Sequence, residues 1–388
     1  MRIVLTGGGT GGHLVPFEPM VDAARVVFIE QKNSLPRWVE RSRLDIYFLG
    51  VTDKKTRDFF DRLGVKVINV PAGKLRRYPS PRTASDVLLR MPVGLVKALL
   101  YMWWIMPDVV ISKGGYGSVP VSIAAVFYRV PVLLHESDVV LGLANRLMTT
   151  LASAVTVGFA ATREAMVSYK SKTVVTGTPV RAGLKLTDQA EAKRLFGFTP
   201  EDKVLLVMGG SQGSEQINRV LLETLPGLIK SMGIIHLTGQ DHLKKVQAAA
   251  DELLKGGGRE QYYKAFGYLS DRMAAALSAA DVVATRAGAT SLAELARLRK
   301  ASILVPLDSA AQDHQRRNAT VFEAAGAARV IDPANLGRAL FEQNVRSLME
   351  NDEIASTLRE NMSLLDYTTA GRSIVELAFK LAAGMVPR

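Results

Sequence analysis

Short apolar runs alternate with longer amphipathic stretches along the whole chain, and this alternation restricts the fold more than any other feature. The runs are rich in β-branched residues and apolar almost throughout, which is typical of parallel strands covered on both faces. Such strands separated by helical stretches predict α/β units with right-handed crossovers. We expect strands at Ile3–Thr6, Ile46–Leu49, Lys66–Val70, Val109–Ser112, Val130–His135, Ala154–Val157, Val204–Met208, Ile234–Thr238, Tyr262–Phe266, Val282–Thr285, Ser302–Val305 and Arg329–Ile331. The helices expected between them include Gln216–Met232, Ser270–Ala279, Ser291–Leu298 and Asp313–Ala325.

The same pattern begins again near residue 203, where a strand leads through the glycine loop Gly209–Gly213 into a helix. A chain of 388 residues is also longer than one hydrophobic core usually serves. We therefore predict an α/β protein of two doubly wound, Rossmann-like domains that face a central cleft, with a seam within residues 158–182. Residues 1–165 are assigned to the first domain and 166–365 to the second. Residues 366–388 are expected to form a helix of the first domain, although the pattern alone does not fix where it packs.

Composition narrows the class of partner. Lys and Arg number 49 and Asp and Glu 37, a net charge of +12, which favours an anionic partner such as a phosphorylated substrate or an acidic membrane surface. Nucleic acid would also explain the charge, but no basic segment with interleaved aromatic residues supports it. Cysteine is absent, which excludes disulfides and thiolate catalysis. The chain starts with a strand rather than a basic and then apolar leader, so we expect no secretory signal.

A loop with five glycines in six positions follows the first expected strand and ends at His13. Glycine has no Cβ, so this backbone can adopt left-handed angles and approach a ligand closely. At a strand-to-helix junction the loop also places N–H groups at the positive end of a helix dipole, where anions bind. No Gly-Lys-Ser/Thr follows and no acidic residue ends the second strand, so neither a P-loop nor a dinucleotide-binding loop is indicated.

Polar residues gather where several of the expected strands end, which is where parallel sheets bind ligands. Each group alone is more often part of a helix cap or a turn than a ligand contact. Because the groups share one position in the fold, however, a ligand site is favoured. No Asp-x-Asp, HxxxH or HExxH motif occurs, so a metal-bridged nucleotide is not expected, and helix N-termini with Arg181 would neutralise a diphosphate. The groups are Lys113–Tyr116, His135–Asp138, Asn145, Gly177–Arg181, Thr285–Glu294 and Asp313–Ala319.

Taken together, these residues resemble the MurG family, the UDP-N-acetylglucosamine:lipid-linked muramyl-pentapeptide N-acetylglucosaminyltransferases of bacterial cell-wall synthesis. The resemblance covers most of the chain, and its motifs are weak singly but specific in this order and at these spacings. They are Gly8-Gly9-Thr10-Gly11-Gly12-His13, Gly73-Lys74-Leu75-Arg76-Arg77-Tyr78, Gly114-Gly115-Tyr116, His135-Glu136, Pro179-Val180-Arg181, Gly209-Gly210-Ser211-Gln212-Gly213, Arg286-Ala287-Gly288-Ala289 and His314-Gln315 with Asn318-Ala319.

The resemblance implies a GT-B fold and an inverting glycosyltransferase with no cofactor and no tightly bound metal. The enzyme would move N-acetylglucosamine (GlcNAc) from UDP-GlcNAc to the muramyl sugar of undecaprenyl-linked lipid I, making lipid II for peptidoglycan. It would work as a peripheral protein on the cytoplasmic face of the cell membrane, alongside other cell-wall synthesis proteins that serve cell shape and division. The implied transfer-site residues are Thr10, Gly11, Gly12 and His13. The implied donor-binding residues are Arg181, Ser211, Leu269, Ala289, Thr290, Ser291, Leu292, Ala293, Glu294, His314 and Gln315.

One departure from the family falls at the expected site. Where the family usually has His-Glu-Gln-Asn, this chain has His135-Glu136-Ser137-Asp138, so an acceptor-only carboxylate would contact the donor or the acceptor in place of an amide. Inverting transfer also needs a base for the acceptor hydroxyl. His13 is the first candidate, because the unperturbed pKa of histidine is about 6.5. Asp138 and Glu136 are the alternatives.

A lipid-linked acceptor requires contact with the membrane. Cations followed by apolar and aromatic side chains suit docking on anionic headgroups, and burial of the tryptophans in a core helix is the alternative. The most apolar stretch, Val87–Met106, is interrupted by charges and a proline, so no spanning helix is expected. The membrane candidates are Arg76, Arg77, Leu88, Leu89, Trp103 and Trp104.

Two other functions remain open on the sequence. One is a GT-B transferase that uses another lipid acceptor, such as diacylglycerol. The other is a UDP-sugar-binding relative without turnover, which Asp138 would allow. Release of UDP from UDP-GlcNAc in the presence of a lipid I analogue separates these functions.

Overall fold

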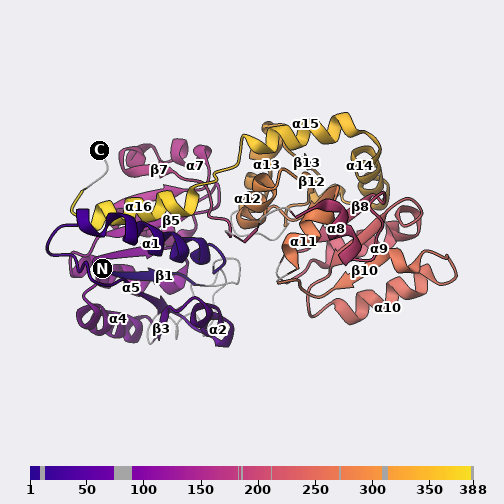
Figure 1. Cartoon of the computed structure of the whole chain (residues 1–388). Coiled ribbons are helices and arrows are strands. Elements are labelled where there is room, and N and C mark those ends of the chain that lie inside the picture. Colours follow the sequence, from indigo (N-terminus) through magenta and orange to yellow (C-terminus); the bar gives the residue numbers. More distant parts are fainter. Residues whose placement is uncertain are drawn as a thin grey trace. The chain divides into compact units, whose positions relative to one another are not determined.

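The computed structural model describes residues 1–8, 14–73, 90–181, 183–184, 187–210, 212–270, 272–307 and 313–385. The chain divides into two compact units, Met1–Arg181 with Tyr367–Arg388 and Ala182–Asp366 (Figure 1). Each unit is built on its own parallel sheet, so each is described by itself.

The first unit contains, within its described residues, a sheet of seven parallel strands in the order β3-β2-β1-β4-β5-β6-β7. Neighbouring strands are in register over most of their length, and the carboxyl ends of β1, β4 and β5 lie at one edge of the sheet. The strands are β1 (Arg2–Thr6), β2 (Asp45–Gly50), β3 (Lys66–Asn69), β4 (Val109–Ser112), β5 (Val132–Glu136), β6 (Ala154–Val157) and β7 (Thr173–Val175).

Alternate side chains of the central strands fill two different cores, one on each face of this sheet. Ile3 and Leu5 of β1 belong to the core formed with α1 and α16, whereas Val4 belongs to the core formed with α4 and α5. This two-residue alternation, with every position apolar, is the pattern of a strand covered on both faces. The helices are α1 (Phe17–Gln31), α2 (Lys54–Arg62), α4 (Met91–Ile105), α5 (Val119–Phe127), α6 (Leu143–Leu151), α7 (Ala160–Ala165) and α16 (Ala370–Ala382).

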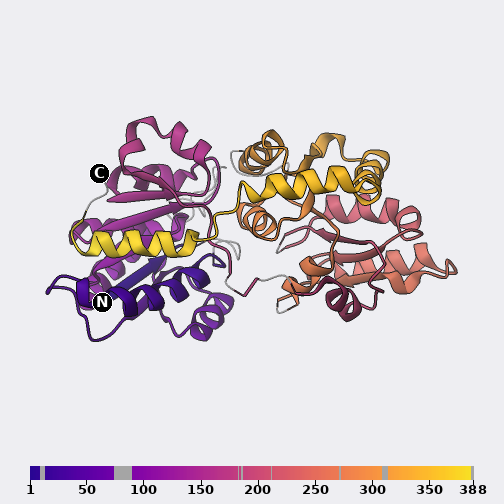
Figure 2. The same cartoon turned by 45° about the horizontal axis from the view of Figure 1, so that its top comes forward.

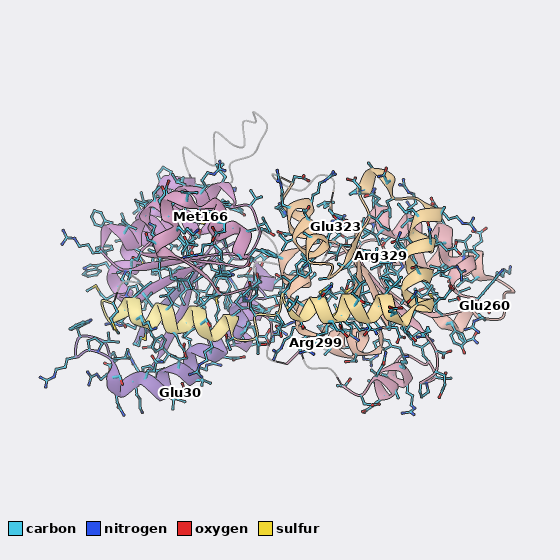
Figure 3. The ribbon with its side chains drawn as sticks, turned by 90° about the horizontal axis from the view of Figure 1, so that it is seen from above. Glu30, Met166, Glu260, Arg299, Glu323 and Arg329 are labelled. Carbon is cyan, nitrogen blue, oxygen red and sulfur yellow. The ribbon has the colours of Figure 1, made fainter. Side chains whose placement is uncertain are left out.

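The C-terminal helix α16 returns to the first unit and lies beside α1 (Figures 1 and 2). Ile374 and Phe379 are buried in the same core as Phe17 of α1. At the surface, the Arg372 guanidinium reaches the Glu30 carboxylate through Nη2–Oε2 at 2.6 Å and Nη1–Oε1 at 3.2 Å (Figure 3 labels Glu30). Burial of apolar area rather than this exposed pair accounts for the docking, because exposed ion pairs contribute little.

The second unit contains, within its described residues, a sheet of six parallel strands in the order β10-β9-β8-β11-β12-β13. The strands are β8 (Val204–Met208), β9 (Gly233–Leu237), β10 (Tyr263–Phe266), β11 (Val282–Thr285), β12 (Ala301–Leu304) and β13 (Arg329–Val330). The helices are α8 (Gln189–Leu195), α9 (Glu215–Leu228), α10 (Leu243–Leu254), α11 (Met273–Ala279), α12 (Ala289–Arg297), α13 (His314–Ala324), α14 (Arg338–Glu350) and α15 (Asp352–Ser363).

The structure moves the expected domain boundary. The sequence assigned 166–181 to the second domain, but β7 pairs with β6 and therefore extends the first sheet. The division falls after Arg181, at the end of the expected seam, and the chain re-enters the first unit at Tyr367. Smaller differences affect the site: β5 extends to Glu136, and α12 begins at Ala289 rather than Ser291.

Candidate active site

The loops that follow β1 and β4 touch at the carboxyl edge of the first sheet. Gly115 has a φ of +79°, and a Cβ on it would lie 2.2 Å from the carbonyl oxygen of Gly8. Only glycine fits this position, because it tolerates both the left-handed backbone and the close approach. The structure thus brings the start of the first glycine loop against the Lys113–Tyr116 segment, as the shared edge position of these segments predicts.

A buried chain of hydrogen bonds runs along this edge from β4 to β6. Lys113 Nζ donates to Ser137 Oγ, which lies 3.2 Å from His135 Nε2. His135 Nδ1 lies 3.0 Å from Thr156 Oγ1, whose hydroxyl donates to the Leu134 carbonyl at 3.3 Å. The contact between His135 and Thr156 is set by strand register, because the two residues are direct partners in β5 and β6.

The directions of these hydrogen bonds determine the tautomer of His135. The Thr156 proton is used on a carbonyl, so Thr156 Oγ1 accepts from His135 Nδ1–H. The bare Nε2 then accepts the Ser137 proton, and Ser137 Oγ accepts from the Lys113 ammonium. Burial first, and the Lys113 charge second, lower the pKa of His135 well below its usual value. His135 is therefore neutral at pH 7, and both of its ring nitrogens are used in hydrogen bonds to Thr156 and Ser137.

Glu136 is held at the end of β5 by three donors. Its Oε1 accepts from the Asp138 backbone N–H at 3.0 Å, and its Oε2 accepts from the Gly142 N–H at 3.0 Å and from Asn145 Nδ2 at 2.8 Å. Burial, followed by the charge of Asp138, raises the pKa of Glu136, while the hydrogen bonds oppose that rise. Glu136 is buried, whereas Asp138 is half-buried at the rim of the edge.

Lys113 is the cation of this edge, and only 4% of its surface is exposed. Burial lowers the pKa of Lys113 to about 8, and the nearby Glu136 and Asp138 carboxylates oppose the effect. Lys113 therefore still carries its proton for most of the time at pH 7. The described edge thus holds one buried ammonium, one buried carboxyl and one half-buried carboxyl close together.

In the second unit, glycines shape the carboxyl edge next to β8 and β9. Gly213 has a φ of +82°, and a Cβ there would lie 2.1 Å from the Thr238 carbonyl oxygen; Gly239 has a φ of +89°. The loops after β8 and β9 therefore pack backbone to backbone. Leu269, one of the residues that the resemblance implies for binding UDP-GlcNAc, is buried just beyond β10 at the same edge of the sheet, although β9 and β8 separate β10 from β11.

The start of α12 presents an uncapped helix N-terminus at this edge. Its N-cap is Gly288, which offers no side chain to the first-turn N–H groups, and a Cβ on Gly288 would meet nothing within 4 Å. Asn318 Nδ2 of α13 donates to the Ala287 carbonyl at 3.1 Å and so fixes the loop that precedes α12. Such an N-terminus can receive a phosphate group.

The remaining residues of the second unit that are expected to bind UDP-GlcNAc follow β11 and β12, which are neighbours in the sheet. Gln315 of α13 accepts a hydrogen bond from the Leu307 N–H through Oε1 at 3.0 Å, which ties α13 to the loop after β12. Glu294 is buried in the second turn of α12, and His314 is the first residue of α13. The other predicted members on α12 are Ala289 and Leu292, which are buried, and Thr290, Ser291 and Ala293, which are half-buried.

The predicted site residue Arg181 is half-buried and is the last residue of the first unit before the division. Thr156 is a residue that sequence reasoning missed, although a threonine inside the otherwise apolar run Ala154–Val157 is a signal for a buried polar contact. The predicted residues that lie outside the described ones are Thr10, Gly11, Gly12, His13, Ser211, Arg76, Arg77, Leu88 and Leu89.

Family models match both halves of the chain. The glycosyltransferase family 28 N-terminal domain matches residues 3–157, and the family's C-terminal domain matches residues 204–369. A UDP-N-acetylglucosamine–N-acetylmuramyl-(pentapeptide) pyrophosphoryl-undecaprenol N-acetylglucosamine transferase of Clostridium tetani is 32% identical over 353 residues, 91% of this chain and 91% of that protein. The Clostridium botulinum protein of the same name is 32% identical over 381 residues, 98% of this chain and 99% of that protein. The chain belongs to the MurG family of glycosyltransferases.

Solved structures agree with a MurG fold. The crystal structure of Acinetobacter baumannii MurG matches with a TM-score of 0.70 and 24% identity, and covers 98% of this chain and 99% of that one. A Staphylococcus aureus MnaA–UDP co-structure matches with a TM-score of 0.70 and 14% identity, and covers 100% of this chain and 98% of that one. At these identities the likeness concerns the fold alone. It confirms the predicted GT-B class of two α/β domains with parallel sheets.

Helix α4 of this MurG-family chain is apolar on two faces. One face packs on the first sheet through Gly94, Ala98, Met102 and Ile105. The tryptophans are not in that core, since Trp103 and Trp104 are each 65% exposed. Within the described part of the chain, no helix combines the length and the apolar character that crossing a membrane requires. The exposed apolar side chains of α4 are Val93, Val96, Leu100, Trp103 and Trp104.

Proposed function

We propose that this MurG-family chain transfers GlcNAc from UDP-GlcNAc to the muramyl sugar of lipid I. The observation that carries the proposal is the similarity over nearly the whole chain to relatives that bear the name of this activity. The polar residues support it, because they gather at the carboxyl edge of each sheet, where α/β folds bind their ligands.

In the proposed reaction, an acceptor hydroxyl oxygen attacks C1 of GlcNAc, the bond from C1 to the UDP oxygen breaks, and the hydroxyl proton passes to a base. We propose His13 as that base and Asp138, at the rim of the edge, as the alternative. Glu136 suits a positioning role better, because three donors already occupy its carboxylate. UDP leaves with an additional negative charge, which preorganised N–H groups and cations stabilise.

The second unit is proposed to bind the donor. The uncapped first turn of α12, from Ala289 to Ser291, would receive the diphosphate together with Ser211 and Arg181. Glu294 would accept hydrogen bonds from the ribose hydroxyls. His314 and Gln315 would contact the hydroxyls of GlcNAc, and the Leu269 backbone would contact uracil.

The exposed face of α4 is proposed to dock on the membrane that holds the acceptor. Its large apolar side chains have between 51% and 65% of their surface in water, and burial in a lipid interface would recover the free energy that this exposure costs. Lys97 of α4 and Arg90, its N-cap residue, are exposed and would face anionic headgroups. Arg76, Arg77, Leu88 and Leu89 would complete this surface, and the protein would act from the cytoplasmic face.

The test is release of UDP from UDP-GlcNAc in the presence of a short-chain lipid I analogue. We expect release that depends on the analogue and is lost in His13→Ala. A parallel reaction with diacylglycerol identifies the alternative acceptor. Release with diacylglycerol but not with lipid I, or UDP binding without any release, would refute the proposed activity. Near-normal turnover of His13→Ala would refute only the choice of base.

A further inference from the structure

A cavity of about 700 Å³ lies at the amino edge of the second sheet, where β8, β11 and β12 begin. The residues directly before these three strands line it, namely Lys203, Asp281 and Lys300, and the order β8-β11-β12 makes them neighbours. The residues of this unit that are proposed to bind UDP-GlcNAc follow the strands, and the length of the four-residue strand β11, about 13 Å, separates the two edges. The cavity is therefore distinct from the proposed donor site, and its volume suits a small molecule.

Cationic side chains outnumber carboxylates in the lining of this cavity. Asp352 pairs with Lys203 at 3.4 Å between Oδ1 and Nζ. Ion-pair partners that lie outside the lining, Lys193 and Asp366, add one charge of each sign and so leave the balance unchanged. Two positive charges remain when each lining carboxylate is set against one cation, and such a surplus attracts an anion. The cations of the lining are Lys203, Arg297, Arg299, Lys300 and Arg359, and its carboxylates are Asp281, Asp352 and Glu360.

Lys300 is the buried cation of this cavity, with 9% of its surface exposed. Its ammonium donates to the Ala280 carbonyl at 2.9 Å and to the Ser278 carbonyl at 3.4 Å, which uses two of its three N–H groups. Among the described residues no carboxylate forms an ion pair with Lys300, since Asp281 pairs with Lys193 at 3.2 Å. A buried ammonium without a paired anion is costly. An anion in the cavity would accept the third N–H and supply the missing charge.

Arg299 adds a guanidinium next to Lys300. Its side chain is exposed, and among the described residues nothing accepts a hydrogen bond from it (Figure 3 labels Arg299). Arg299 ends α12 with a φ of +50°, where its N–H donates to the Ala296 carbonyl and the Lys300 N–H donates to the Leu295 carbonyl. Glycine is the residue usual at such a helix end, so arginine here costs backbone free energy. Its planar fork of donors fits the oxygens of a phosphate group.

We propose that this cavity binds a small phosphorylated molecule, whose phosphate group contacts Lys300 and Arg299. The surplus of two positive charges matches a phosphate dianion better than a single carboxylate. Arg359 of α15 would contribute to the same anion, because its Nη2 is held in the lining only by a long hydrogen bond to the Asp281 carbonyl, at 3.5 Å. This site is additional to the donor site and does not rest on the function proposed above.

The test measures binding of inorganic pyrophosphate to the full-length protein by calorimetry, with UDP in excess so that a nucleotide site is already filled. We expect Arg299→Gly to raise the Kd for pyrophosphate about tenfold or more, because it removes a charge-assisted contact. The variant should fold at least as stably as wild type, since glycine suits a φ of +50°. Loss of binding therefore cannot come from loss of folding.

Arg129→Gly is the matched control. Arg129 is also an exposed arginine with a left-handed backbone, at a φ of +58°, but it ends α5 in the first unit. The two substitutions change the net charge and the backbone in the same way, and we expect Arg129→Gly to leave the Kd for pyrophosphate unchanged. Lys300→Met, which keeps a buried side chain of similar length without its charge, should raise that Kd about tenfold or more. The affinity for UDP should be the same in all three variants.

Absence of pyrophosphate binding to wild type overturns the proposal, and so does binding of vesicles that contain anionic lipid without binding of pyrophosphate. Equal losses in Arg299→Gly and Arg129→Gly would show a general effect of net charge and would also overturn it. If Lys300→Met does not fold, the comparison of the two glycine variants still decides. Failure of wild type to turn over lipid I would refute the proposed activity and leave this test unaffected.

Discussion

The side-chain amide of Asn145 donates to Glu136 Oε2 at 2.8 Å while the oxygen of the same amide lies against Gly114. One side chain of α6 thereby connects the ends of β5 and β4. The contact is close, because a Cβ on Gly114 would lie 1.7 Å from Asn145 Oδ1. The loop after β4 therefore depends on glycine at position 114, because any side chain there would prevent this packing against Asn145.

Replacing Gly114 by alanine should be strongly destabilising. Gly114 has a φ of +75°, so alanine at this position would be forced into a left-handed backbone conformation. Its Cβ would also clash with the Asn145 side chain. We expect the free energy of unfolding to fall by about 2–4 kcal/mol, measured by urea denaturation. Gly337→Ala is the control: a Cβ there meets nothing within 4 Å at a φ of −138°, and the loss should not exceed about 1 kcal/mol. Equal losses at the two positions would contradict this account of the loop.

Most strands of the two sheets could be predicted because they are nearly continuous apolar runs bounded by polar or glycine residues. Val204–Met208 and Val282–Thr285 coincide with β8 and β11. β7 escaped prediction because Thr173–Val175 is too short to show periodicity, and its omission placed the domain boundary too early. Its assignment depends on backbone pairing with β6, which a single sequence does not display.

The segments that meet at the carboxyl edges of the sheets could be predicted, but their contacts could not. Glycine loops and polar residues after strands indicated which segments share an edge. That Lys113, Ser137 and His135 form one directed chain depends on the register of β5 with β6 and on the order β1-β4-β5. A lone lysine or serine after a strand carries no signal of that kind, because both residues are common in solvated turns.

Stability should fall in acid because of a second buried histidine, His236 in β9. Asn218 Nδ2 donates to the Thr238 carbonyl, so Asn218 Oδ1 accepts from His236 Nε2–H at 2.9 Å, and Nδ1 then accepts from the Tyr263 hydroxyl at 2.8 Å. Burial lowers the pKa of His236 from 6.5 to about 3. Between pH 6.5 and about 3, His236 therefore binds a proton in the unfolded chain but not in the folded one. The contribution to stability is complete above pH 6.5 and is lost as the pH falls toward 3.

The measurement is the free energy of unfolding in urea at several pH values between 7 and 4. The His236→Gln variant cannot take up this proton, so its decline with falling pH should be shallower than that of wild type by about 1.4 kcal/mol per pH unit. Tyr263→Phe is the matched control, because it removes the hydroxyl and keeps the histidine; it should lower stability but retain the steep decline. Parallel declines in wild type and His236→Gln would show that His236 is not responsible.

Glu294→Gln should weaken UDP binding with little effect on folding. The variant keeps the shape of a buried side chain but loses the charge that the proposed ribose contacts use. We expect the Kd for UDP, measured by calorimetry, to rise about 10- to 100-fold, since hydrogen bonds to a charged group contribute about 1.5–3 kcal/mol. Binding of 2′-deoxy-UDP should respond less, because one of the hydroxyls is missing. Glu323→Gln is the control, because Glu323 is an exposed residue of α13 (Figure 3), and an equal effect there would remove the ribose assignment.

Trp103→Ser/Trp104→Ser should detach the protein from membranes without unfolding it, because both side chains lie on the exposed face of α4 and not in its core. We expect sedimentation with vesicles that contain anionic lipid to fall at least about tenfold, since each buried aromatic side chain contributes about 1.5–3 kcal/mol. Trp38→Ser is the matched control, because Trp38 is even more exposed, at 73%, but lies outside α4. Lys97→Ser should weaken binding at low salt only, since salt screens the attraction between Lys97 and the headgroups. Equal binding of wild type to neutral vesicles in high salt would exclude the electrostatic part, and unchanged binding of the double tryptophan variant would exclude α4 as the docking surface.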